Sequence, residues 1–295
     1  VGLSEDVFAV LGAILDEGDE MLVPDRAWLN YHNVPRMLGA VPVTYSLKEE
    51  NGYQMDLAEL RSKVTDKTKA VVIITPNNPT GGVLSQDTLQ GLADLAIEKD
   101  LLVISDEVYE RLIYDGEKHI SIASLPGMKE RTVLINGFSK AYAMTGWRLG
   151  YAAAPAAILE QMLKIHQYAI MCAPTTSQYA AVSALKNGDP DVAMMRESYN
   201  QRRRFLLHAF AEMGIECFEP KGAFYTFPNI KRFGMTSEEF ATRLLQEEKV
   251  AVVPGTAFGG CGEGFVRISY AYSLKNLKEA LSRIERFINR LDGKA

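Results

Sequence analysis

The sequence predicts an α/β fold with a mostly parallel sheet flanked by helices, followed by a smaller α+β unit. Short apolar runs alternate with stretches of helical hydrophobic spacing, which is typical of parallel strands buried on both faces. The runs are residues 70–75, 101–105, 132–135 and 149–153. The chain has 295 residues, 47% of them hydrophobic and 23% charged, which is long enough for two domains.

The elements before the middle of the chain follow from capping residues and spacing. Ser4 is of a type that caps helix N-termini, so we expect a first helix after it, ending at Gly18. The apolar face of this helix consists of Val7, Val10, Leu11, Ile14 and Leu15. A short strand is expected over Glu20–Pro24. Ser85 is expected to cap a second helix, whose apolar face holds Leu89, Leu92, Leu95 and Ala96.

The second part of the chain has a different organisation. A long segment at 191–213, rich in Arg and Glu, follows Asn187-Gly188-Asp189-Pro190 and predicts a long connecting helix. Residues 215–295 then alternate strand and helix patterns between Gly and Pro turn signals. We therefore divide the chain into a large domain, residues 1–189, and a second part, residues 190–295, with the connecting helix and a small domain.

Composition argues against several classes of protein. A net charge of −5, from 32 basic and 37 acidic residues, argues against nucleic-acid and membrane-surface binding. No apolar run approaches the roughly 20 residues of a membrane span. An odd number of cysteines without metal-ligand spacing indicates free thiols in a reducing compartment, so we expect a cytoplasmic protein. The four histidines form no ligand cluster, and we predict no metal site.

Lys140 is the clearest candidate for a chemically reactive residue. It follows the apolar run at 132–135, within Gly137-Phe138-Ser139-Lys140-Ala141, and Arg148 comes eight positions later. Most lysines are simply solvated at the surface. A lysine just beyond a buried strand is instead partly desolvated, which lowers its pKa. Such an amine can act as a nucleophile that forms a Schiff base with a carbonyl compound.

Two polar segments follow other apolar runs. Asp106 ends Leu101-Leu102-Val103-Ile104-Ser105, and Asn77-Asn78-Pro79-Thr80-Gly81 follows the run at 70–75. Taken alone, Asp106 could be a loop carboxylate or a helix cap, and Asn-Asn-Pro a turn. A buried carboxylate, however, requires a cationic partner. Because ligand sites in α/β sheets lie at the carboxyl ends of the strands, we expect these segments to share one site.

Together, Asn78-Pro79-Thr80-Gly81, Asp106-Glu107-Val108-Tyr109 and the Lys140 segment, in this order, resemble the aspartate aminotransferase family. These are class I/II pyridoxal 5'-phosphate (PLP) enzymes of fold type I, and the resemblance covers essentially the whole chain. It implies an aminotransferase that moves an amino group between an α-amino acid and a 2-oxo acid. It further implies a ping-pong mechanism through a Lys140 aldimine. Aspartate, aromatic amino acids, alanine and N-acetylated diaminopimelate all remain open as substrates.

The resemblance also implies roles around the cofactor ring. Lys140 would carry PLP and move the proton between the substrate Cα and the cofactor C4′. Asp106 would keep the pyridinium nitrogen protonated and strengthen the ring as an electron sink. Tyr109 and Asn78 would both hydrogen bond to the O3′ oxygen. Trp28 would stack on the ring, although a Trp that is only packed is the competing interpretation.

The phosphate and the substrate carboxylate each have predicted anchors. The guanidinium fork of Arg148 matches a phosphate, as do the backbone N–H groups of Gly2, Leu3 and Ser4 at the start of the first helix. Ser139 would add a hydroxyl. Many relatives carry a hydroxyl residue where this chain has Gly137, so one phosphate hydrogen bond of the family pattern is open here.

Arg267 is the predicted partner of the substrate α-carboxylate, with Asn78 beside it. Strand alternation in Gly264-Phe265-Val266-Arg267-Ile268 places Val266 and Ile268 on one face and Arg267 on the other. A solvated arginine on a half-buried strand is the alternative interpretation.

The start of the chain bears on its assembly. In the family, a stretch like Val1-Gly2-Leu3-Ser4 follows an N-terminal arm that reaches toward a partner subunit, so we expect this segment to be lacking here. The resemblance implies a homodimer with active sites at the subunit boundary. Two other functions stay open: another fold-type I reaction, such as a carbon–sulfur β-lyase, and the PLP-sensing domain of a transcription regulator.

Overall fold

The computed structural model describes residues 1–293, and its largest element is a six-stranded sheet in the order β2-β1-β3-β4-β5-β6. The strands are β1 Glu20–Pro24, β2 Val41–Tyr45, β3 Thr68–Ile74, β4 Leu102–Asp106, β5 Thr132–Gly137 and β6 Gly150–Ala153. The first five run parallel, and β6 pairs antiparallel with β5. The prediction of a mostly parallel sheet, with strands at the four apolar runs and at Glu20–Pro24, is confirmed.

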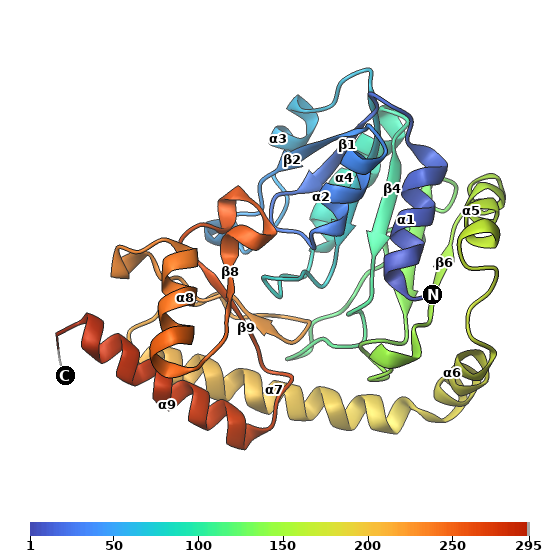
Figure 1. Cartoon of the computed structure of the whole chain (residues 1–295). Coiled ribbons are helices and arrows are strands. Elements are labelled where there is room, and N and C mark those ends of the chain that lie inside the picture. The colour runs from blue at the N-terminus through green and yellow to red at the C-terminus, as the bar shows by residue number, and fades with distance from the viewer. Residues whose placement is uncertain (294–295) are drawn as a thin grey trace.

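Helices cover both faces of this sheet (Figure 1). They are α1 Leu3–Ile14, α2 Asn30–Met37, α3 Leu57–Ser62, α4 Gln86–Glu98 and α5 Ala156–Ala169. Alternation along β3 divides the core into two layers, because successive side chains point to opposite faces. Val72 and Ile74 pack with α1, α2 and α5, whereas Val71 and Ile73 pack against α3 and α4.

The ends of two helices test the expected caps. Ser85 accepts a hydrogen bond from the amide of Thr88, so the predicted cap of α4 is confirmed. The predicted Ser4 cap is wrong, because α1 already begins at Leu3 and Gly2 occupies the capping position with φ of +75°. Glycine reaches that conformation without steric cost. The helix also ends at Ile14, before the expected stop at Gly18.

The C-terminal elements surround a second, antiparallel sheet in the order β7-β9-β8. Its strands are β7 Tyr225–Thr226, β8 Val253–Pro254 and β9 Val266–Ser269, and the remaining helices are α6 Thr175–Asn187, α7 Asp189–Glu212, α8 Ser237–Glu248 and α9 Leu274–Leu291. Short 3₁₀ helices cover Glu49–Asn51, Ile122–Ser124, Thr145–Trp147, Lys231–Phe233, Gly255–Phe258 and Gly260–Gly262. The division of the chain between residues 189 and 190 stays a prediction.

The long helix α7 runs along the bottom of Figure 1 from α6 to the C-terminal elements. It confirms the predicted connecting helix, and it starts slightly earlier because Pro190 fits the first helical turn. No helix within residues 1–293 is both long and apolar enough to cross a membrane.

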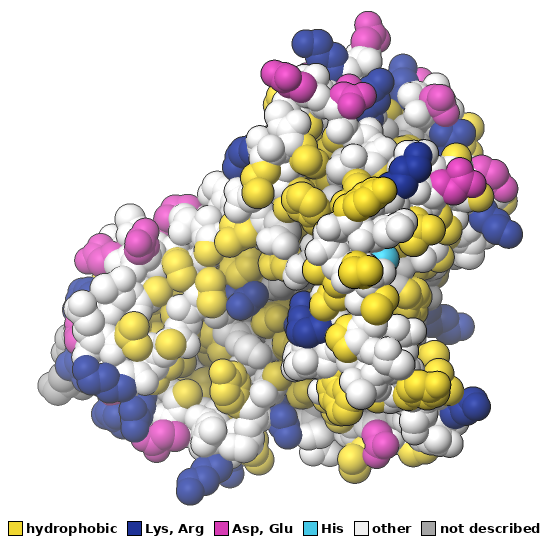
Figure 2. Space-filling model, turned by 45° about the vertical axis from the view of Figure 1, so that its right-hand side comes forward, with side chains coloured by type: hydrophobic (Ala, Val, Ile, Leu, Met, Phe, Trp, Pro, Cys, Tyr) yellow, Lys and Arg dark blue, Asp and Glu magenta, His cyan; other side chains and the backbone are white. Residues whose placement is uncertain are grey.

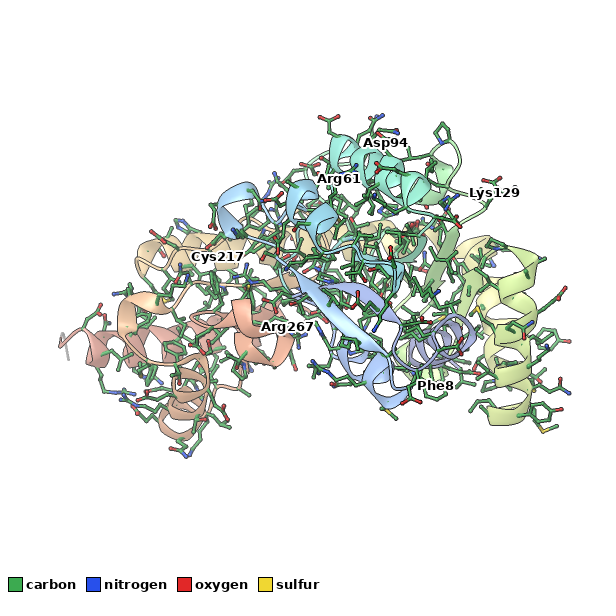
Figure 3. The ribbon with its side chains drawn as sticks, turned by 90° about the horizontal axis from the view of Figure 1, so that it is seen from above. Phe8, Arg61, Asp94, Lys129, Cys217 and Arg267 are labelled. Carbon is green, nitrogen blue, oxygen red and sulfur yellow. The ribbon has the colours of Figure 1, made fainter. Side chains whose placement is uncertain are left out.

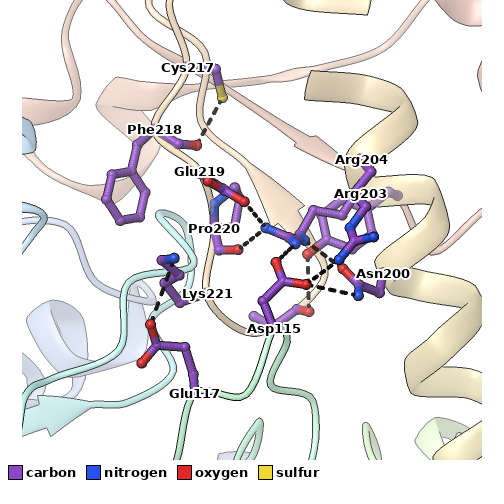
Figure 4. Close-up of polar contacts among 12 residues, drawn as sticks. Asp115, Glu117, Asn200, Arg203, Arg204, Cys217, Phe218, Glu219, Pro220 and Lys221 are labelled. Atoms are coloured by element: carbon purple, nitrogen blue, oxygen red, sulfur yellow. Dashed lines mark hydrogen bonds and ion pairs between the residues drawn. The ribbon is translucent and has the colours of Figure 1, made fainter. Parts of the chain in front are cut away.

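A buried arginine joins α7 to the segment that precedes β7 (Figure 4). Arg203 is completely buried, forms an ion pair with Asp115, and donates to Glu219 and to the carbonyl of Pro220, both at 2.9 Å. The next amides, of Lys221 and Gly222, donate to the carbonyl of Gly81 at 2.8 and 3.0 Å. This segment therefore ties α7 to the turn that follows β3.

Candidate active site

A cavity of about 260 Å³ lies where β3, β4 and β5 end. Figure 2 shows a hollow near the middle of this face of the molecule, with side chains of the Lys and Arg colour at it. Ten of the residues predicted for the site line the cavity: Leu3, Ser4, Trp28, Asn78, Asp106, Tyr109, Ser139, Lys140, Arg148 and Arg267. The structure thus brings together residues that are up to 264 positions apart in the chain.

The strand register explains why the polar segments meet. Ile74 at the end of β3 pairs with Asp106 at the end of β4, and Asp106 pairs with Ile135 of β5. The segments that follow these parallel strands therefore leave the sheet side by side. In the turn after β3, Asn77 accepts hydrogen bonds from the amide and hydroxyl of Thr80, which leaves the neighbouring Asn78 side chain at the cavity.

Asp106 is buried and has two donors. Tyr31 of α2 donates to its Oδ2 at 2.9 Å, and the amide of Val108 donates to its Oδ1 at 3.2 Å. Burial raises the pKa of Asp106 to about 6, while these two hydrogen bonds and the charge of Lys140 oppose that rise. A cation against this carboxylate would hold it ionised.

Tyr31 was missed by sequence reasoning. The available signal is its position three residues after Trp28, in the turn that leads into α2, where the amide of Tyr31 donates to the carbonyl of Trp28 at 3.1 Å. The two rings lie edge to face, with centroids 6.1 Å apart. Trp28 lines the cavity, whereas Tyr31 is buried and lies next to Asp106.

Lys140 presents a half-buried amine between aromatic rings. Its Nζ lies 5.9 Å from the ring centroid of Tyr109 and 5.7 Å from that of Phe224. Burial lowers the pKa of Lys140, the charge of Asp106 opposes this, and the charges of Arg267 and Arg148 add to it. A lowered pKa makes the unprotonated amine, the form that condenses with carbonyl compounds, more available.

Arg148 and the start of α1 form a positively polarised corner of the cavity. A Cβ at Gly2 would lie 2.7 Å from Nη2 of Arg148, so only glycine allows the guanidinium to approach this closely. Ser139 is buried at the same cavity. The helix N-terminus, the guanidinium and the hydroxyl are together suited to a phosphate group.

Gly137 departs from the family pattern for a packing reason. A Cβ at this position would lie 2.7 Å from Cδ1 of Leu3 and 3.0 Å from both the Cα of Gly150 and the carbonyl oxygen of Leu149. The antiparallel pairing of β5 with β6 puts that backbone directly opposite. A hydroxyl-bearing side chain has no room at position 137 in this arrangement.

Arg267 reaches the cavity from β9, and Figure 3 shows it at the junction of the C-terminal elements with the first sheet. Its Nη1 donates to Oδ1 of Asn78 at 2.9 Å. Its Nε is buried and has no hydrogen-bond partner within residues 1–293. Buried donors are nearly always paired, so this atom fits a site that receives a carboxylate.

Two aromatic residues of the site were also missed. Tyr225 lines the cavity, and its hydroxyl lies 3.1 Å from that of Tyr109. Phe224 packs edge to face on Tyr109, with ring centroids 5.4 Å apart. Their sequence signal was weak, because the Gly222-Ala223-Phe224-Tyr225 segment has neither a charge nor a ligand-binding pattern.

Glu107 points to a different set of partners. The hydroxyls of Ser105 and Ser121 donate to its Oε1, and His119 lies 2.7 Å from its Oε2. Glu110 is close enough that the three groups Glu107, Glu110 and His119 could hold a metal ion, a grouping that the sequence did not indicate. Because both oxygens of Glu107 already have partners, we assign it a structural role.

A mostly parallel sheet with its ligand cavity at the carboxyl ends of the central strands, completed by an arginine from a second sheet, is the architecture of fold-type I PLP enzymes. Comparison with known proteins narrows this class. The family model of the class I and II aminotransferases matches residues 2–284. This chain belongs to that family, and it is a PLP-dependent aminotransferase.

Relatives with two substrate specificities match over nearly the whole chain. An aspartate aminotransferase of Pyrococcus abyssi is 49% identical, covering 98% of this chain and 75% of the relative. The aromatic-amino-acid aminotransferase 2 of Thermococcus litoralis is 46% identical with the same coverage. A crystal structure of an aromatic aminotransferase from Pyrococcus horikoshii superposes with a TM-score of 0.96 at 47% identity, covering 98% of this chain and 78% of that one.

Proposed function

We propose that the protein transfers amino groups from an α-amino acid to a 2-oxo acid in two half-reactions at one cavity, with Lys140 as the residue that carries the cofactor. The observation that supports this most directly is the cavity that Lys140 and Asp106 share. When bound, PLP supplies an aldehyde that captures amines and a ring that withdraws electrons. The protein has to hold the cofactor, orient the substrate and move protons.

Each part of the cofactor would have its own set of residues. Asp106, ionised by contact with the ring nitrogen, would hold a proton there. Tyr109 and Asn78 would hydrogen bond to the phenolic oxygen, and Trp28 would cover the ring. The phosphate would be bound by Arg148, Ser139 and the amides of Gly2, Leu3 and Ser4.

The substrate would be oriented by Arg267 and deprotonated by Lys140. A guanidinium fork fixes a carboxylate in two directions, and Asn78 already holds one nitrogen of Arg267. This would align the bond that breaks at the substrate Cα, an effect of orientation. Lys140, with its lowered pKa, is suited to accept and return that proton.

Borohydride reduction of the PLP-treated protein, followed by peptide mapping, tests the assignment of Lys140. We expect the label on Lys140, and none in Lys140→Ala, while Lys249→Ala on the C-cap of α8 serves as a control that keeps it. A label on another lysine of the native protein would refute the proposal.

Kinetics distinguish aminotransfer from the alternative chemistry. Initial rates with varied L-aspartate or L-phenylalanine and 2-oxoglutarate should give the parallel double-reciprocal lines of a ping-pong mechanism. Release of pyruvate from cystathionine would instead favour a carbon–sulfur β-lyase. The relative rates with L-aspartate and L-phenylalanine decide between aspartate and aromatic substrates.

We also propose a homodimer in the cytoplasm. Within residues 1–293, ten of the eighteen exposed large hydrophobic side chains fall between Trp147 and Met194, a segment that includes α5 and α6. Exposed apolar side chains gathered on a few elements are typical of an interface. The free cysteines Cys172, Cys217 and Cys261 support a reducing compartment. Light scattering during size-exclusion chromatography should give twice the chain mass, and a monomer alone would contradict the dimer.

A further inference from the structure

Tyr225 contacts two groups that have separate tasks in the proposed site. Its hydroxyl meets that of Tyr109, and its ring lies against the guanidinium of Arg267. We propose that Tyr225 is a positioning residue that orients both groups, its hydroxyl acting on Tyr109 and its ring on Arg267. The proposal rests on the proposed function, which assigns Tyr109 to the cofactor and Arg267 to the substrate carboxylate.

The ring contact follows from the pairing of β7 with β9. Tyr225 is opposite Ser269, so Arg267 is its diagonal neighbour on the same face of the sheet. The guanidinium carbon lies 4.4 Å from the centroid of the Tyr225 ring and 4.8 Å from that of Phe258. Held between two rings and bonded to Asn78, the guanidinium has a fixed plane in which to receive a carboxylate.

The contact between the two hydroxyls raises the question of which tyrosine donates the hydrogen bond. The hydroxyls of Tyr225 and Tyr109 are 3.1 Å apart, and both residues are buried. Only one of the two can donate in this bond. If Tyr225 donates, Tyr109 keeps its own proton for the phenolic oxygen of the cofactor and becomes a stronger donor, since hydrogen bonds in a chain reinforce each other. The charged groups that face Tyr109 are Asp106 and Arg267, with Lys140 above its ring.

The backbone around Tyr225 is well anchored. The amide of Ala223 donates to the carbonyl of Leu112 at 2.9 Å, and the carbonyl of Phe224 accepts from the amide of Tyr270 at 3.0 Å. With the Arg203 network just before it, the segment is fixed from both sides. A side chain on such a support can orient other groups rather than follow them.

A double-mutant cycle on the PLP-loaded enzyme tests the role of the hydroxyl. Tyr225→Phe, Tyr109→Phe and the double variant are titrated with pH while the absorbance of the bound cofactor is followed. A hydrogen bond to the phenolic oxygen favours its ionised form, so Tyr109→Phe should raise the pKa of the bound chromophore. Tyr225→Phe should raise it less, and should add nothing in the Tyr109→Phe background. Equal effects of Tyr225→Phe in both backgrounds would overturn the role of the hydroxyl.

The ring is tested by substrate binding. Tyr225→Phe keeps the ring and should change the KM for L-aspartate and L-phenylalanine by less than about twofold, whereas Tyr225→Leu should raise KM roughly tenfold with a smaller change in kcat. An unchanged KM in Tyr225→Leu would overturn this part. If Tyr225→Leu does not fold, as judged by circular dichroism, the same comparison of KM is made with Tyr225→Met, which also removes the ring. Failure of the proposed function would appear separately, as a missing borohydride label on Lys140 in the native protein.

Discussion

The hydroxyl of Tyr31 donates a hydrogen bond of 2.9 Å to Oδ2 of Asp106, and both side chains are buried. The bond joins α2 to the end of β4, and it favours the ionised form of a carboxylate whose burial favours the neutral form. An ionised Asp106 is what a protonated ring nitrogen requires. With Asp106 against the ring nitrogen, as proposed, Tyr31 would support cofactor binding without being exposed to the cavity.

Tyr31→Phe should weaken PLP binding roughly tenfold to a hundredfold, because a hydrogen bond to a charged group contributes roughly 1.5–3 kcal/mol. The measurement is an absorbance titration of the apoprotein with PLP. Tyr45→Phe is the matched control, since the buried Tyr45 hydroxyl donates to the carbonyl of Val72, away from the cavity. It should reduce stability and leave PLP affinity unchanged. Equal losses of affinity in both variants would argue against a specific role for Tyr31.

Asp106→Asn should stabilise the apoprotein at neutral pH while abolishing tight PLP binding. The native pKa of Asp106 is raised from 3.8 to about 6, so the native state binds this proton more tightly than the unfolded chain. That contribution to stability is complete below the unfolded value and is lost as pH rises through the native one. The free energy of unfolding of the variant should therefore exceed that of the native apoprotein by about 3 kcal/mol well above pH 6, with the gap closing toward pH 4. Urea denaturation across this range checks it, and a constant gap would contradict it.

Arg203 and Arg204 provide a test of the network in Figure 4, because both pair with Asp115. Arg203 is fully buried, whereas the side chain of Arg204 is 66% exposed. Arg203→Leu should lower the free energy of unfolding by about 3 kcal/mol, whereas Arg204→Leu should change it little because solvent screens an exposed pair. Chemical denaturation measures both. Similar losses would mean that burial of the pair does not govern its contribution.

Gly81 and Gly116 have nearly the same backbone, with φ of +74° and +79°. A Cβ at Gly81 would lie 2.4 Å from Cβ of Pro220, whereas one at Gly116 would meet nothing within 4 Å. Gly116→Ala should cost about 1 kcal/mol of stability, the conformational penalty alone. Gly81→Ala should cost at least twice as much and weaken PLP binding, because it displaces the turn that carries Asn78. Denaturation midpoints and PLP titration decide whether the two positions differ.

Much of the fold and of the site composition followed from local patterns. The apolar runs predicted the strands of the first sheet. Asp106 and Lys140 follow two of these runs, and they were expected at one edge of the sheet because the carboxyl ends of parallel strands lie together. The helix cap at Ser85 obeyed a local rule, and the one at Ser4 did not. There the left-handed geometry of Gly2 and its contact with Arg148 set the start of α1.

The sequence by itself determined where the buried strands lie along the chain and which polar segments follow them. It also carried the three motifs that identify an aminotransferase. Only the tertiary structure brought Tyr31 into hydrogen-bond contact with Asp106, and Tyr225 into contact with both Tyr109 and Arg267. The physical reason is that hydrophobic period and capping act over a few residues. Contacts between a helix, a loop and a distant sheet depend on how those elements pack, and a buried tyrosine has the same local pattern whether it serves the core or the site.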